Sequence, residues 1–100
     1  MKKYGLHGNL QAVEGKGDSL ADILVQASAL VSDAKGCHLY MVSRDAQDKE
    51  RVWVTEVWDS KEDHDQSLHM EGVQALIAQA MPLLAGQPEK GVVMEVLTGI

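Results

Sequence analysis

The chain has 100 residues, of which 45% are hydrophobic and 24% charged, and its formal net charge is −6. This composition is typical of one globular domain, so we expect residues 1–100 to form a single domain. The acidic balance argues against a nucleic-acid partner and against an anionic membrane surface, because both are bound through clustered Lys and Arg. The apolar runs are too short to span a bilayer, and Cys37 alone forms no intrachain disulfide. We therefore expect a cytoplasmic protein.

The first elements expected along the chain are a strand over Tyr4–Val13 and a helix after residue 17. One face of the strand is apolar and carries Tyr4, Leu6, Leu10 and Ala12. Asp18 stands at the position of a helix N-cap, and Gly36 is expected to stop the helix. Apolar residues recur between them at helical spacing: Leu20, Ile23, Leu24, Ala27, Leu30 and Val31.

The middle of the chain predicts two strands, Cys37–Ser43 and Arg51–Trp58, joined by the polar hairpin loop Arg44–Glu50. The second strand has two distinct faces because its side chains alternate. One face carries Val52, Val54, Glu56 and Trp58, and the other carries Trp53, Thr55 and Val57.

The last third of the chain predicts a short helix, a longer helix and a final strand. Ser60 and Asp63 form a capping pattern, in which a hydroxyl is followed three residues later by an acid. A longer amphipathic helix follows over Val73–Leu84, and Pro82 is expected to kink or end it. Val92–Thr98 predicts a strand that is apolar on both faces.

The resulting order is strand, helix, strand, strand, helix, strand. It is typical of the ferredoxin-like βαββαβ fold, an α+β architecture with a four-stranded antiparallel sheet and helices on one face. The third and fourth strands are apolar on both faces, and a large exposed apolar patch marks an interface. We therefore expect a homodimer that packs through the free sheet face with two-fold symmetry. The alternative is that the last strand lies near the sheet centre, with the helices reaching around it.

The segment Val54–His64 resembles the signature of the antibiotic biosynthesis monooxygenase family. In that family a strand ends in Glu-x-Trp, and a short acidic turn that contains Ser leads into a helix. The stretches His64–Leu68 and Ala80–Leu84 are similar to one bacterial subgroup. The resemblance extends to the element order over nearly the whole chain, and it implies a dimeric α+β barrel.

The resemblance also implies a pocket between the sheet and the helices. Oxygenases of the family have a Trp at the end of the third strand and a hydrogen-bonding residue, commonly Tyr, six positions later. Trp58 and His64 occupy these positions, and Val54 stands where the family has a pocket Asn. Ser67 and Ile77 stand where haem-degrading members have a Trp and a His, so we do not expect haem degradation.

Five residues are the candidates for the site. His64 is the expected acid–base residue, because histidine exchanges protons near neutral pH. Asn9 is a second catalytic candidate, since haem-degrading members carry an Asn on the first strand. Trp58 would form a flat wall beside an aromatic ring, and His7 and His69 are further candidates for substrate contact. The structural alternatives are a solvated helix position for His64 and a core position for Trp58.

The resemblance predicts a monooxygenase that oxidises a small, hydroquinone-like aromatic substrate with dioxygen, without flavin, haem or metal. Glu56 is expected to form a structural hydrogen bond or ion pair. One alternative is a small-molecule binding protein or an isomerase on the same dimeric scaffold. A phosphorylated substrate would need a cationic pocket, so finding Arg44 or Arg51 in the cleft would favour this alternative. Another is a structural or regulatory dimer whose cleft is filled by side chains.

Overall fold

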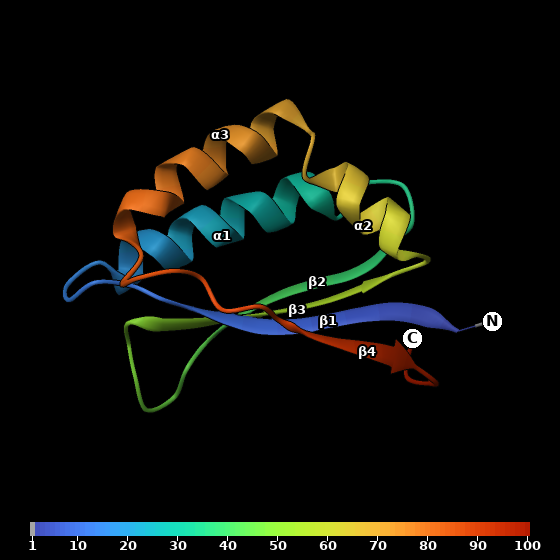
Figure 1. Cartoon of the computed structure of the whole chain (residues 1–100), viewed down its shortest axis with the longest axis horizontal. Helices are drawn as coiled ribbons and strands as arrows, with labels where there is room; N and C mark the ends of the chain where they lie inside the picture. The colour runs from blue at the N-terminus through green and yellow to red at the C-terminus, as the bar shows by residue number, and fades with distance from the viewer. Residues whose placement is uncertain (1) are drawn as a thin grey trace.

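The computed structural model describes residues 2–100, which form a four-stranded sheet with three α-helices on one side (Figure 1). In chain order the elements are β1 (Lys3–Gln11), α1 (Gly17–Val31), β2 (Cys37–Arg44), β3 (Arg51–Trp58), α2 (Lys61–Ser67), α3 (Glu71–Ala80), the 3₁₀ turn η1 (Met81–Leu83) and β4 (Val92–Val96). The strand order is β2-β3-β1-β4, with all neighbours antiparallel. The predicted ferredoxin-like α+β fold is thus confirmed. Within residues 2–100, no helix has the length and apolarity to cross a membrane.

The register of the two central strands defines the face that the helices cover. Tyr4 pairs with Trp58 and Leu10 pairs with Val52, so the even-numbered side chains of β1 and β3 point the same way. Val52 and Trp58 are fully buried on this side. The buried residues of α1 and α3 complete the core: Leu20, Ile23, Leu24, Ala27, Leu76 and Ala80. The predicted apolar faces of both strands are therefore confirmed.

The start of α1 is capped differently from the sequence prediction. Asp18 lies in the first turn of the helix and pairs with Arg44 at 2.8 Å, so it does not act as the N-cap. Instead, the carboxylate of Glu50 accepts hydrogen bonds from the backbone N–H groups of Gly15 and Gly17, the second at 2.9 Å. A side chain from the β2–β3 hairpin thus satisfies the free donor of Gly17 in the first turn of the helix, and that of Gly15 in the turn before it. Gly17 suits this close approach, because a Cβ there would collide with the hairpin backbone.

The other helix boundaries are set by local sequence. α1 ends at Val31, before Gly36, which adopts a φ of 80° in the turn that enters β2. Ser60 Oγ accepts a hydrogen bond of 3.1 Å from the backbone N–H of Asp63, which confirms the predicted cap of α2. Pro82 lies in η1 directly after α3, so it ends the helix as one of the two expected outcomes.

The face of the sheet opposite the helices, the open face, is uncovered and partly apolar (Figure 1). Its exposed apolar side chains include Met41 on β2 and Val92 and Met94 on β4, which are 46%, 62% and 39% exposed. β4 is an edge strand that pairs only with β1. The alternative that placed the last strand near the sheet centre is therefore wrong.

Candidate functional site

A cleft lies between the covered face of the sheet and the helices. It consists of two adjoining hollows of about 200 Å³ and 250 Å³. Both hollows are lined by Leu10, Leu24, Tyr40 and Ile77. Val54 and Glu56 line the second hollow. Val54 stands where the family has an Asn, so the wall is apolar at that position. Mostly aliphatic walls with a few polar groups are typical of small-molecule sites. An open cleft also disfavours the purely structural alternative, which required a filled one.

Glu56 is the buried acid of this cleft. The alternation of β3 turns its side chain to the covered face, where Oε1 accepts a hydrogen bond of 3.0 Å from Trp58 Nε1. The same oxygen lies 3.8 Å from His64 Nε2, and the two side chains are 11% and 12% exposed. Burial raises the pKa of the Glu56 carboxyl, against the opposing effects of the Trp58 hydrogen bond and of His64. A carboxylate with a raised pKa is a better proton acceptor near neutral pH.

His64 lies on α2 and contacts the cleft through Glu56, with Nε2 3.8 Å from its carboxylate. Its Nδ1 lies 2.9 Å from Asp65 Oδ1, so Asp65 orients the ring with Nε2 toward Glu56. The imidazole lies between two aromatic rings, with centroid distances of 5.7 Å to Tyr4 and 5.9 Å to Trp58. His64 is therefore held in place on several sides, in contrast to the solvated position that its acidic neighbours in the sequence favour.

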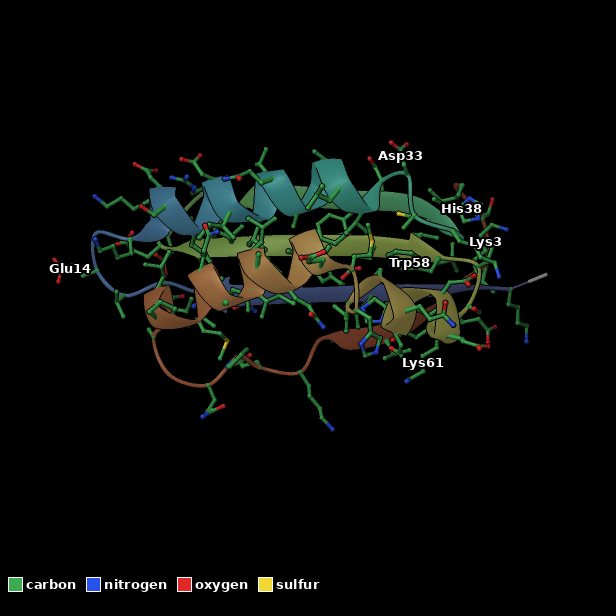
Figure 2. All side chains as sticks on the ribbon, turned by 90° about the horizontal axis from the view of Figure 1, so that it is seen from above. Lys3, Glu14, Asp33, His38, Trp58 and Lys61 are labelled. Atoms are coloured by element: carbon green, nitrogen blue, oxygen red, sulfur yellow. The ribbon has the colours of Figure 1, made fainter. Side chains whose placement is uncertain are left out.

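Trp58 is fully buried at the end of β3 and packs in a cluster with Val31 and Val73. Figure 2, which looks down on the helices, shows it at the end of the sheet where α2 lies, remote from Glu14 at the other end. Its ring supports His64 edge-on, and its N–H group holds Glu56. Trp58 is thus a core residue that positions the acid and the histidine.

Tyr40 is a residue of the site that the sequence analysis did not identify. It pairs with Glu56 across β2 and β3 and lines both hollows. Burial, and then the negative charge of Glu56, raise the pKa of the Tyr40 phenol well above its usual value. Tyr40 therefore stays protonated and able to donate a hydrogen bond into the cleft. The sequence places Tyr40 on a strand whose side chains alternate between two faces. Only its pairing with Glu56 across β2 and β3 shows that Tyr40 is on the face toward the cleft.

The remaining candidate residues lie in three different places. Asn9 borders the second hollow, but it alternates with Leu10 on β1, so its side chain points to the open face. His7 belongs to the open face, where Nδ1 lies 2.8 Å from Thr55 Oγ1 and the ring stacks on Trp53 with centroids 5.0 Å apart. His69 is exposed in the turn between α2 and α3. The fold thus brings His64 and Trp58 together, with Asn9 at the margin, and leaves His7 and His69 outside.

The two arginines that would mark a phosphorylated substrate are not in the apolar cleft. Arg44 pairs with Asp18 at the surface. Arg51 lines a separate polar hollow of about 250 Å³, which Asn9 also borders.

Residues 4–79 match the family model described as antibiotic biosynthesis monooxygenase. A solved structure from Chloroflexus aurantiacus J-10-fl that bears the same family name is 38% identical, with a TM-score of 0.87 over 98% of this chain and 96% of that chain. A structure from Nitrosomonas europaea with this family name has a TM-score of 0.89 at 15% identity, covering 95% and 90% of the two chains. One from Deinococcus radiodurans has a TM-score of 0.76 at 24% identity, covering 97% and 93%. No curated protein matches the sequence.

Proposed function

Because this chain belongs to the antibiotic biosynthesis monooxygenase family, we propose that it oxidises small, hydroquinone-like aromatic molecules with dioxygen and needs no flavin, haem or metal. The observation that carries this proposal is Glu56 in the wall of an apolar cleft, with His64 Nε2 3.8 Å from its carboxylate. A base inside an apolar wall suits a substrate that has a flat ring and an acidic phenol.

The proposed reaction balances without an external reductant. A ring carbon of the hydroquinone loses its hydrogen and forms a bond to one oxygen atom, while the O–O bond of dioxygen breaks. The ring gives up four electrons and becomes a hydroxyquinone, and the second oxygen atom leaves as water with the two hydrogens released. The protein must favour loss of the phenolic proton, because the phenolate is the species that gives an electron to dioxygen.

In this proposal Glu56 accepts the phenolic proton and His64 is its acid–base partner. The raised pKa of Glu56 suits proton transfer from a phenol at neutral pH. Tyr40 donates a hydrogen bond to the developing phenolate from the opposite strand, and the aliphatic walls exclude water from the reactive intermediate. Trp58 positions both acid–base groups. The function does not require His7 or His69.

We further propose that the chain forms a homodimer through the open face. Met41, Val92 and Met94 expose apolar surface on it, and a second copy would bury these side chains. β3, at the centre of the sheet, would then have both faces covered, which accounts for its two-sided apolar pattern.

The test is oxygen uptake by purified, metal-free protein with a panel of hydroquinones. We expect Glu56→Gln and His64→Gln each to lower kcat by about 10²-fold or more, because a positioned acid–base group contributes roughly 10²–10⁴-fold. Glu71→Gln and His38→Gln are matched controls at exposed positions outside the cleft. Full activity in Glu56→Gln, or no uptake with any hydroquinone, would contradict the proposal.

A second candidate function is a small-molecule binding protein or an isomerase on the same scaffold. The observation that favours it is Val54, which makes the wall apolar where the family's oxygenases present an amide. Saturable binding of hydroquinones to the cleft without oxygen uptake would select this function over the first.

A further inference from the structure

The two hollows of the cleft adjoin but differ in chemistry. Four residues line both of them: Leu10, Leu24, Tyr40 and Ile77. The larger, which we call the acid hollow, has Glu56 in its wall. The smaller, which we call the aliphatic hollow, is lined from α1 and α3, which run side by side above the sheet (Figure 1). Apart from Tyr40, its lining consists of aliphatic side chains, a methionine and a proline. A polar part of a ligand thus fits the acid hollow, and an apolar part fits the aliphatic hollow.

The sheet leaves room for a flat ring in the acid hollow. Gly8 interrupts the row of side chains on the covered face of β1, between Leu6 and Leu10, and all three line the hollow. Gly8 pairs with Val54, and Glu56 is the next residue of β3 that faces the same way. Diagonal neighbours on one face of an antiparallel pair lie within reach of long side chains. A ring that lies over Gly8 is therefore flanked by the Glu56 carboxylate.

Neither hollow alone has the size of a typical small-molecule site. Their volumes are about 250 Å³ and 200 Å³, whereas such sites begin at roughly 300 Å³. Because the hollows adjoin, a ligand that occupies both has the space of an ordinary site. The aliphatic hollow also opens to solvent, since Leu68, Ile77 and Met81 line it and are exposed. An apolar group in this hollow would cover these side chains, which the hydrophobic effect favours.

We propose that the substrate is a hydroquinone with a short alkyl tail, which places its ring in the acid hollow and its tail in the aliphatic hollow. This inference rests on the proposed function, from which it takes the hydroquinone ring and the role of Glu56. The tail is uncharged, because within residues 2–100 no charged side chain lines the aliphatic hollow and a charge there would lose its hydration without gaining a partner. Each methylene group that the hollow removes from water should raise the affinity about fourfold.

The experiment measures Kd by isothermal titration calorimetry under argon, so that no dioxygen is present and no turnover occurs. The probes are methyl-, propyl- and pentylhydroquinone, which share the ring and differ only in the tail. We expect pentylhydroquinone to bind at least tenfold more tightly than methylhydroquinone, with the propyl compound between them.

A pair of alanines on α3 provides the variant and its control. Ala80 is buried and lines the aliphatic hollow, whereas Ala78 is exposed and lines neither hollow. Ala80→Leu fills part of the aliphatic hollow, so the advantage of the pentyl tail should fall to threefold or less while methylhydroquinone binds as in the parent. Ala78→Leu adds the same side chain outside the cleft and should keep the full advantage.

Met81→Gln replaces Ala80→Leu in the test if that variant fails to fold. Met81 is an exposed residue of the rim, so its side chain can change without disturbing the core. Glutamine has a similar length but is polar, and the advantage of the pentyl tail should fall about fourfold, the equivalent of one methylene group.

Three results would overturn this inference. One is a pentyl advantage of less than tenfold in the parent, which includes the case that no probe binds. The second is an advantage above threefold in a folded Ala80→Leu. The third is an equal loss in Ala78→Leu, which would place the tail outside the aliphatic hollow. A pentyl advantage without oxygen uptake contradicts the proposed function alone, whereas oxygen uptake with equal binding of all three probes contradicts this inference alone.

Discussion

The two faces of the sheet are built from alternate residues of the same strands, yet they carry different chemistry. On the covered face, β3 presents Glu56 and Trp58 to the helices, and both are buried. On the open face, the same strand presents Trp53, which stacks on His7 and donates a hydrogen bond of 2.9 Å to Asp45. Each face thus has its own Trp and its own His, but only the covered face combines them with a buried acid and a cleft.

The difference between the faces shows what burial adds to a residue type. His64 and His7 both lie against a Trp, at centroid distances of 5.9 Å and 5.0 Å. His64 has a carboxylate 3.8 Å away at a low-dielectric wall, whereas the hydrogen-bond partner of His7 is the neutral Thr55 hydroxyl. The helices exclude water from Glu56, and burial therefore raises the pKa of the carboxyl that lies beside His64.

The largest expected contrast is between the two tryptophans of β3. We expect Trp58→Ala to lower the free energy of unfolding by about 3–5 kcal/mol, because it leaves a cavity in the core. Trp53→Ala on the open face should cost only about 1–2 kcal/mol, from its stacking and one hydrogen bond. Urea unfolding followed by circular dichroism at one protein concentration measures both. Equal costs would mean that the open face is as buried as the core.

The next contrast concerns association. Met94→Asp places a charge on the open face and should raise the dissociation constant of the proposed dimer by about 30-fold or more, since burying an unpaired charge at an interface costs ~2 kcal/mol or more. Val25→Asp, at an exposed position on α1, is the control and should leave the dimer intact. Sedimentation equilibrium distinguishes the two. A monomeric Val25→Asp beside a dimeric Met94→Asp would move the interface to the helix side.

A smaller effect is expected in the pH dependence of stability. The pKa of Glu56 is raised above 4.5 in the folded protein, so the folded state holds the proton more tightly than the unfolded state. The stability that this contributes is complete at low pH and is lost as pH rises through the folded pKa. Glu56→Gln should therefore be the more stable protein at pH 7, with a smaller decline from pH 4 upward. Thermal unfolding across this pH range measures the decline in stability. A steeper decline in Glu56→Gln than in the parent would contradict a raised pKa of Glu56.

The smallest effect is expected at His7. His7→Ala removes the partner of the Thr55 hydroxyl and should cost about 1 kcal/mol of stability. Oxygen uptake should stay within about twofold of the parent, since a contribution of general acid–base catalysis would be ~10²-fold or more. A tenfold or larger loss of uptake would instead assign His7 to the substrate site, as its place among the sequence candidates suggested.

Much of the fold was predictable because it rests on local patterns. Alternating side chains identified the inward faces of β1 and β3, and the Ser60 cap and Pro82 identified the boundaries of two helices. The start of α1 was not predictable in this way. Its cap is Glu50, 33 residues beyond Gly17, and such a partner is known only when the hairpin is placed against the helix.

The amino-acid order alone specified the elements and their inward faces, since these follow from spacings of a few residues. The family resemblance added Trp58 and His64 as members of one region. Only the packed structure revealed that Glu56 lines the cleft beside His64, that Tyr40 faces it from the next strand, and that His7 points to the opposite side. The reason is physical. Periodicity within a strand or helix is local, whereas strand register and helix docking join residues far apart in the chain, and these contacts determine which polar groups are buried together.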